Sequence, residues 1–144
     1  MSPTTDLLWS SILTHGGHLP IRTPEDIVLV RTAVRQAALH LKFGLVDQTK
    51  LVTAASEIAR NTLLYGKGGD VLIEPVLASK PGLRLVFTDQ GPGIPDIDRA
   101  LTDGFTTGGG MGLGLGGTRR LVDDFKIVSA PTEGTTVSIT KWSR

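Results

Sequence analysis

Glycine is concentrated in one stretch of the chain, and this stretch constrains the fold more than any other feature. Seven of the ten residues from Gly108 to Gly117 are glycine. Each glycine in an ordered segment costs backbone entropy and adds no side chain to a core. Glycine does allow positive φ and a close approach of main-chain N–H groups, which bind phosphate when they precede a helix. The stretch from Asp89 to Gly117 therefore predicts a nucleotide site.

The composition indicates one folded domain without disulfides or a cysteine- or histidine-based metal site. Of the 144 residues, 40% are hydrophobic and 20% are charged, which suits a single core. The chain has no cysteine, as is typical of a reducing cytosol, and its three histidines lack metal-ligand spacing with acids. We expect a cytoplasmic protein with one domain over residues 17–144. Residues 1–16 would be an N-terminal tail that forms a short helix or docks on a partner.

Charge and hydropathy argue against two classes of partner. The formal net charge is +1 and no basic stripe with interleaved aromatic residues is present, so direct nucleic-acid binding is not expected. No apolar run reaches the about 18 residues that a bilayer-spanning helix needs. The N-terminus has no basic segment ahead of an apolar one, so we expect no secretion signal.

Two helices are predicted in the first half of the chain. The first begins after Thr23 as N-cap, with Pro24 at its first position, and Gly44 is expected to stop it. The second is expected to be capped by Asp47 and stopped by Gly66.

Strand signals come in pairs joined by short turns. Pro20 cannot donate to a ladder, so the first strand is expected at a sheet edge, and the last strand is expected to close the sheet. A helix is expected from about Gly112 to Asp124. The order predicts an α/β two-layer sandwich, a mixed, mostly antiparallel sheet with helices packed on one face. The expected strands are residues 18–22, 71–77, 83–88, 125–130 and 135–142.

Three phosphate-binding designs fit the glycines poorly. The P-loop pattern is absent, because glycine rather than a hydroxyl residue follows Lys67. A dinucleotide fingerprint, Gly112-x-Gly114-x-x-Gly117, follows residues 106–110, which cannot form the strand that this fingerprint needs. A kinase-type glycine loop would need later HRD and DFG sequences, and neither occurs.

Four short motifs in a fixed order fit a different design. They are Glu57-Ile-Ala-Arg-Asn61, Asp89-Gln-Gly-Pro-Gly93, Gly110-Met-Gly-Leu-Gly-Leu-Gly116 and Gly134-Thr135. With these motifs the chain resembles the GHKL, or Bergerat-fold, ATP-binding domain shared by DNA gyrase B, Hsp90, sensor histidine kinases and MutL. Among GHKL proteins it is most similar to the anti-sigma-factor and switch serine kinases of the RsbT type, over about residues 20–142.

The resemblance implies roles for four side chains. Asp89 would accept a hydrogen bond from the exocyclic amine of adenine, and Thr135 or a water would serve another ring position. Asn61 would hold Mg²⁺ through its amide oxygen. Glu57, one helical turn from Asn61, would be the catalytic general base. Without the resemblance, Glu57 would be read as a solvated helix residue paired with Arg60.

The glycine motifs would supply the rest of the ATP site. Gly91 and Gly93 would turn the chain under the base, and residues 105–109 would form a very short lid that leaves the γ-phosphate open to a protein substrate. The expected ATP-binding residues are Asn61, Asp89, Gly91, Gly93, Ile94, Thr107, Gly108, Gly109, Gly110, Met111, Gly112, Leu113, Gly114, Leu115, Gly116 and Thr135.

The resemblance implies an ATP- and Mg²⁺-dependent protein serine/threonine kinase of a bacterial partner-switching module that regulates a sigma factor. Its substrate would be a STAS-domain antagonist protein. The alternative is an ATP-dependent binding module that sequesters a sigma factor or activates a phosphatase. A sensor histidine kinase or a gyrase-type ATPase fits less well, because no phosphoacceptor helix pair, transducer domain or long lid is recognised.

Overall fold

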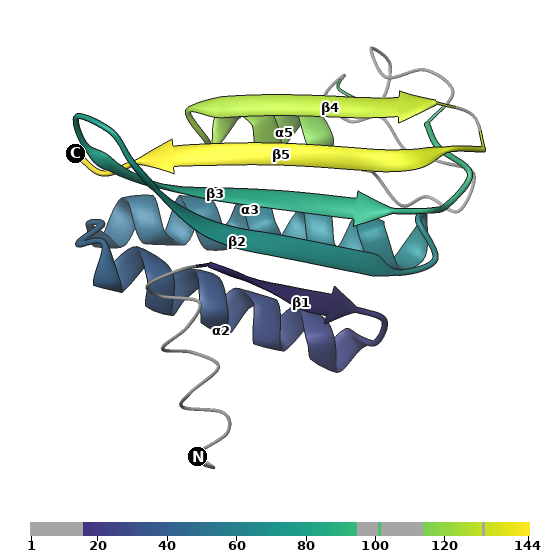
Figure 1. Cartoon of the computed structure of the whole chain (residues 1–144), viewed down its shortest axis with the longest axis horizontal. Coiled ribbons are helices and arrows are strands. Elements are labelled where there is room, and N and C mark those ends of the chain that lie inside the picture. Colours follow the sequence, from purple (N-terminus) through teal and green to yellow (C-terminus); the bar gives the residue numbers. More distant parts are fainter. Residues whose placement is uncertain (1–15, 95–100, 102–113, 131) are drawn as a thin grey trace.

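The computed structural model describes residues 16–94, 101, 114–130 and 132–144. Within these residues, helices cover one face of a five-stranded sheet (Figure 1). The strand order is β1-β2-β3-β5-β4, and every neighbouring pair is antiparallel. The expected α/β two-layer sandwich is confirmed, and no parallel pair occurs in the described part of the sheet. The elements are β1 (Gly17–Ile21), α2 (Pro24–His40), α3 (Leu45–Leu64), β2 (Gly69–Leu77), β3 (Pro81–Asp89), α5 (Leu115–Arg120), β4 (Asp124–Ala130) and β5 (Gly134–Trp142).

Helix α2 begins as its sequence predicts. The Asp26 N–H donates to the Thr23 Oγ1 at 3.2 Å, and the Thr23 N–H donates back to the Asp26 Oδ2 at 3.1 Å. This capping box satisfies two N–H groups that have no partner within the helix. The buried positions that follow, among them Val30 and Val34, recur at helical spacing and face the sheet.

The connection between α2 and α3 differs from expectation. Lys42, with φ 64°, takes the left-handed conformation after α2, so Gly44 is not the residue that stops it. Gly44 is instead the N-cap of α3, and the expected Asp47 cap is wrong. Asp47 lies in the first turn, where its carboxylate Oδ1 is 3.5 Å from the Lys141 Nζ. The end of α3 at Leu64 agrees with the predicted stop at Gly66 within two residues.

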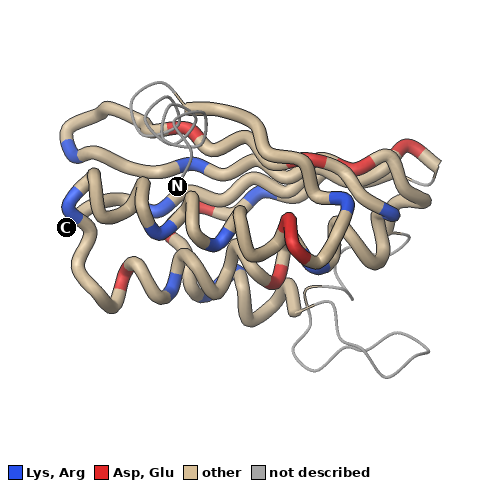
Figure 2. Tube along the Cα trace, turned by 90° about the horizontal axis from the view of Figure 1, so that it is seen from below, with Lys and Arg blue, Asp and Glu red and all other residues tan. Residues whose placement is uncertain are grey.

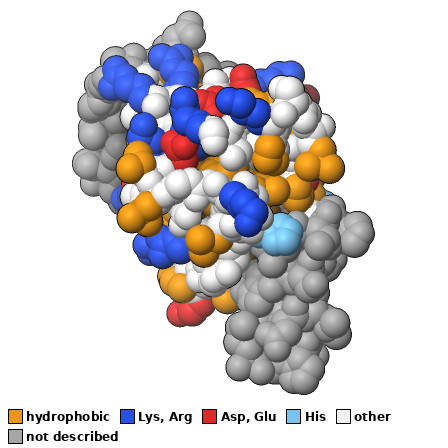
Figure 3. Space-filling view, turned by 90° about the vertical axis from the view of Figure 1, so that its left-hand side faces the viewer, with side chains coloured by type: hydrophobic (Ala, Val, Ile, Leu, Met, Phe, Trp, Pro, Cys, Tyr) orange, Lys and Arg blue, Asp and Glu red, His pale blue; other side chains and the backbone are white. Residues whose placement is uncertain are grey.

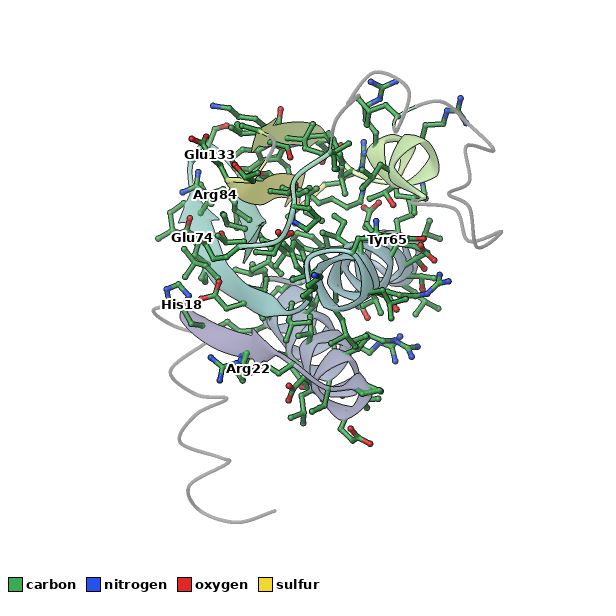
Figure 4. All side chains as sticks on the ribbon, turned by 90° about the vertical axis from the view of Figure 1, so that its right-hand side faces the viewer. His18, Arg22, Tyr65, Glu74, Arg84 and Glu133 are labelled. Carbon is green, nitrogen blue, oxygen red and sulfur yellow. The ribbon has the colours of Figure 1, made fainter. Side chains whose placement is uncertain are left out.

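Along the strands, side chains alternate between the helix-covered face of the sheet and its open face. On β3, Leu83, Leu85 and Phe87 are buried toward the helices. Arg84 lies on the open face and pairs with Glu74 of β2, with 2.6 Å between the Arg84 Nη2 and the Glu74 Oε1 (Figure 4). This alternation places every second side chain of β3 in the core.

The order of the last strands corrects one expectation. β1, which carries Pro20, lies at a sheet edge as predicted, but β5 lies between β3 and β4 and does not close the sheet. β5 lies inside because it pairs with β3 on one side and with its hairpin partner β4 on the other. The helix expected to reach Asp124 ends at Arg120, and Asp124 opens β4.

The end of the molecule near the α2–α3 connection carries a mixed surface. At the end near the α2–α3 connection, exposed hydrophobic side chains are interspersed with Lys and Arg (Figure 3). Charged residues of both signs are distributed along the helical layer (Figure 2).

No helix in the described residues is long and apolar enough to span a membrane. The tail proposed for residues 1–16 lies outside the described residues except for Gly16.

Candidate functional site

Helix α3 and strand β3 finish, and strand β5 begins, at the same end of the molecule (Figure 1). A cleft opens there, and it is lined by residues of α3, β3, α5 and β5. Aliphatic and aromatic side chains form much of its wall, together with the polar side chains of Asn61, Asp89 and Thr135. This combination suits an aromatic ligand with a polar edge. The lining residues are Ile58, Asn61, Thr62, Tyr65, Gly66, Phe87, Asp89, Gly93, Ile94, Leu115, Thr135 and Val137.

Asp89 is the most buried acidic side chain of the cleft, with 8% of its surface exposed. It is the last residue of β3. Its Oδ1 accepts the Gly91 N–H at 2.9 Å and the Thr135 N–H at 3.3 Å. Burial raises the pKa of this carboxyl, and the bonds from Gly91 and Thr135 oppose that rise. The two N–H groups fix the carboxylate in one orientation, with Oδ2 beside Gly66.

Two glycines, Gly66 and Gly134, make room for Asp89, and a third, Gly91, makes room for Gly66. A Cβ at Gly66 would lie 2.5 Å from the Asp89 Oδ2, and a Cβ at Gly91 would lie 2.7 Å from the Gly66 Cα. Gly134 has φ 83°, and a Cβ there would collide with the Asp89 carbonyl oxygen. The glycine of the Gly134-Thr135 motif is therefore required by the close approach of the turn before β5 to the end of β3.

Ser129 of β4 connects the β4–β5 hairpin to the loop after β3. Its Oγ accepts the Ile94 N–H at 2.7 Å, donates to the Gly134 O at 3.1 Å and lies 2.8 Å from the Thr135 Oγ1. A second bond to the same loop runs from the Thr132 N–H to the Pro92 O at 2.9 Å. The loop that follows Asp89 is thus attached to the β4–β5 hairpin at two points.

Glu57 and Asn61 lie one turn apart on α3, between the cleft and the start of α5. Asn61 lines the cleft. Glu57 lies beside Gly114, the N-cap of α5, where a Cβ would meet the Glu57 Oε2 at 2.7 Å. Gly114 has φ 68°, a conformation that favours glycine. The Glu57 Oε1 is also 3.6 Å from the Arg60 Nη1, and both side chains are substantially exposed.

The cleft brings together six of the expected site residues, Asn61, Asp89, Gly93, Ile94, Leu115 and Thr135. Gly91 donates to Asp89 behind the cleft, Gly114 caps α5 beside Glu57, and Gly116 is buried within α5. The remaining residues expected at the site lie outside the described residues. They are Thr107, Gly108, Gly109, Gly110, Met111, Gly112 and Leu113.

Sequence reasoning missed several residues of the cleft. Ile58 and Tyr65 lie three residues before and four residues after Asn61, and Thr62 lies four residues after Ile58. Phe87 and Val137 lie two positions from Asp89 and Thr135 on their strands. Their signal was therefore present in the periodicity. Ser129 gave no such local signal, because it is placed by its register opposite Thr135.

Comparison with known proteins identifies the family. Residues 46–143 match the HATPase_c family model, described as "Histidine kinase-, DNA gyrase B-, and HSP90-like ATPase". The chain belongs to the HATPase_c family. The GHKL resemblance drawn from the four motifs is therefore confirmed.

Among HATPase_c relatives, the chain is 48% identical over 125 residues to the protein named serine/threonine-protein kinase RsbT of Bacillus subtilis. That alignment covers 86% of this chain and 94% of the relative. The chain is also 33% identical over 102 residues to an anti-sigma F factor of Bacillus licheniformis, over 66% of this chain and 69% of that protein.

Two solved structures share the HATPase_c fold. The crystal structure of the RsbU and RsbW domains of a Mycobacterium tuberculosis protein matches 91% of this chain with a TM-score of 0.63 at 24% identity. This chain spans 33% of its length. The catalytic domain of the histidine kinase ThkA matches 90% of this chain and 97% of its own with a TM-score of 0.55 at 16% identity. At these identities the two structures show the fold alone.

Proposed function

We propose that this protein is an ATP-dependent protein serine/threonine kinase of a cytoplasmic partner-switching module, and that its substrate is a STAS-domain antagonist protein. The observation that carries the proposal is the 48% identity to a named serine/threonine-protein kinase over 86% of the chain. The cleft supports it, because both Asp89 and Asn61 line it and Glu57 lies next to the N-cap residue of α5.

The adenine end of the proposed ATP site is the part of the cleft around Asp89 and Thr135. The fixed, buried Asp89 carboxylate is a hydrogen-bond acceptor, and the exocyclic amine of adenine is a donor. Thr135, directly or through a water, serves a second ring position. Ile94 supplies apolar contact with the ring. A base with an oxygen in place of the amine would bring two acceptors together, which disfavours guanine.

The phosphate end of the proposed site includes the start of α5. Main-chain N–H groups of Gly114, Leu115 and Gly116 would bind phosphate oxygens, together with the proposed ATP-binding residues 107–113. The described residues hold no cluster of three or more His, Asp or Glu that could bind a metal alone. Mg²⁺ bound to a nucleotide needs only one or two protein oxygens, so the Asn61 amide oxygen fits this ion. The ion would neutralise charge on the phosphates.

Glu57 is the proposed general base. The substrate hydroxyl oxygen forms a bond to the γ-phosphorus, its proton passes to the Glu57 carboxylate, and the bond between the γ-phosphorus and the ADP oxygen breaks. Proton removal of this kind contributes about 10²- to 10⁴-fold, whereas positioning and charge neutralisation supply most of the rate. The alternative role for Glu57 is a solvated ion pair with Arg60, at 3.6 Å.

The test is phosphotransfer from Mg-ATP to a purified STAS-domain protein, followed by mass spectrometry of the modified residue. We expect phosphoserine or phosphothreonine on the STAS protein. Glu57→Gln should reduce transfer by about 10²-fold or more while ATP still binds. Glu25→Gln, in the exposed first turn of α2, is the matched control and should transfer normally. Absence of transfer under conditions where ATP binds would overturn the proposal.

A second function is supported by the anti-sigma F factor relatives. In that reading, ATP binding drives capture of a sigma factor or activation of a phosphatase, and catalysis is secondary. Pull-down from a bacterial extract with and without ATP, followed by mass spectrometry, separates the two outcomes. Capture that persists unchanged in Glu57→Gln, with no phosphotransfer by the wild type, would favour this function over the kinase.

A further inference from the structure

The Ser129 hydroxyl has more polar neighbours than it has protons. A serine hydroxyl carries one proton and two acceptor positions. The Ile94 N–H uses one acceptor position, at 2.7 Å. The Gly134 carbonyl oxygen, at 3.1 Å, can only accept, whereas the Thr135 hydroxyl, at 2.8 Å, can donate or accept. The direction of the bond between Ser129 and Thr135 is therefore set by where the Ser129 proton goes.

Two arrangements of the protons satisfy this geometry. If Ser129 donates to the Gly134 oxygen, then Thr135 must donate to Ser129, and all three bonds are made. If Ser129 donates to Thr135, the Thr135 hydroxyl no longer donates to Ser129 and can donate to another acceptor. The first arrangement is favoured when the cleft holds no acceptor, and a ligand acceptor beside Thr135 favours the second.

Adenine presents a donor and an acceptor side by side, the N6 amine and the ring nitrogen N1. Asp89 offers the acceptor for the amine. A donor is then needed for N1, and the second arrangement gives Thr135 that role. We propose that Ser129 is a positioning residue for adenine recognition, which turns the Thr135 hydroxyl toward the base as a donor. This inference rests on the proposed function, because it requires ATP in the cleft.

The bond directions give the relay a defined physical effect. In the second arrangement Ser129 donates to Thr135 and Thr135 donates to N1, directly or through one water. Each bond in such a chain polarises the next. Ser129 also restricts rotation of the Thr135 hydroxyl, so less ordering is needed when the base binds. Without the Ser129 hydroxyl, this bond no longer restricts rotation of the Thr135 hydroxyl.

Replacement of Ser129 should leave the fold intact. Ser129 is only partly buried, so water can reach the groups that lose their partner. The loop after Asp89 keeps its second attachment, the bond from the Thr132 N–H to the Pro92 O. General loosening of this loop would weaken every nucleotide equally, whereas loss of the relay weakens only those that have N1.

The experiment compares ATP with 1-deaza-ATP, in which a C–H group replaces N1. Calorimetry with the full chain should show that Ser129→Ala weakens ATP by about 3- to 10-fold, the value of one net hydrogen bond. The same change should weaken 1-deaza-ATP by no more than about twofold. Ser129→Thr keeps the hydroxyl and should retain the wild-type ratio of the two affinities. Ser138→Ala removes a hydroxyl from the other face of the sheet and should change neither affinity.

A double-mutant cycle checks that Ser129 acts through Thr135. In a Thr135→Val background, Ser129→Ala should cause no further loss of ATP affinity beyond about twofold. A full further loss, or an equal loss for ATP and 1-deaza-ATP, would overturn the inference. Failure of the wild type to bind ATP would overturn the proposed function as well. Normal nucleotide discrimination without phosphotransfer would overturn the kinase proposal and leave this inference standing.

Discussion

Gly66→Ala should disturb both stability and nucleotide binding, because Gly66 lies against the Asp89 side chain. A methyl group at position 66 would lie 2.5 Å from the Asp89 Cβ and from its Oδ2. The Asp89 Cγ would be closer still, and ordinary van der Waals contact begins at 3.4 Å, so the two residues must separate by about 1 Å. A shift of this size would lengthen or break the two hydrogen bonds to the Asp89 Oδ1, because the N–H groups of Gly91 and Thr135 already lie 2.9 Å and 3.3 Å from it.

The expected magnitude follows from these contacts. Overpacking a buried position costs about 1–3 kcal/mol, so the free energy of unfolding should fall by about 2 kcal/mol. A displaced carboxylate also meets adenine in poorer geometry. A hydrogen bond to a charged group is worth about 1.5–3 kcal/mol, and each 1.4 kcal/mol is tenfold in affinity. We expect ATP affinity to fall by about tenfold or more.

Gly117→Ala is the matched control for this change. A Cβ at Gly117 meets nothing within 4 Å, and Gly117 lies inside α5. Alanine there should raise the free energy of unfolding by about 0.5–1 kcal/mol. Urea titrations followed by circular dichroism measure stability, and calorimetry measures ATP affinity. If Gly66→Ala matched the wild type in both measurements, the close approach of Gly66 and Asp89 would have no energetic importance and the reasoning would be refuted.

The buried ion pair, the raised pKa and the start of α5 each allow a further test. Asp47→Ala should lower the free energy of unfolding by about 3 kcal/mol in urea titrations, because it leaves the buried Lys141 ammonium without its carboxylate partner. A smaller loss of stability in Asp47→Ala than in Lys141→Met would contradict this reasoning. Because burial raises the folded-state pKa of Asp89, its contribution to stability is present below the unfolded pKa of about 3.9 and is lost as the pH rises through the folded pKa. The free energy of unfolding of Asp89→Asn should therefore increase relative to that of the wild type as the pH rises through the folded pKa of Asp89. A difference between the two proteins that does not change with pH would contradict the raised pKa. Gly114→Ala should lower phosphotransfer more than ATP affinity in paired assays, because its Cβ would meet the Glu57 Oε2 at 2.7 Å; an equal loss would argue against a catalytic Glu57.

The parts of the fold that were predictable depend on local chemistry. Thr23 and Pro24 begin α2 as expected, because capping involves only the next few residues. Asn61 and Asp89 meet at one cleft as the motifs imply. The α2–α3 connection was mispredicted because Gly44 and Asp47 are each compatible with two local roles. Asp47 was assigned to a cap on local grounds, whereas in the folded chain it pairs with Lys141 from the far end of the sequence.

Ser129 and Gly66 show what the sequence alone could not give. Neither belongs to the four motifs, and no local pattern indicates that either residue contacts Asp89 or Thr135. Ser129 gains its role from the β4–β5 register, which places it opposite Thr135. Gly66 was read as a helix stop, whereas its lack of a side chain is needed by Asp89, a residue on another element. Both roles arise from contacts between segments, which local patterns do not encode.

The bond from the Thr135 N–H to Asp89 joins residues 46 positions apart, and this has a consequence for how the protein is made. On the ribosome, β3 emerges well before β5, so the Asp89 carboxylate lacks one of its two N–H donors until Thr135 has been synthesised. Pairing of distant strands is also a slow step in folding. Nucleotide binding is therefore acquired late, and a nascent chain that ends before Gly134 should be unable to occupy the cleft with nucleotide.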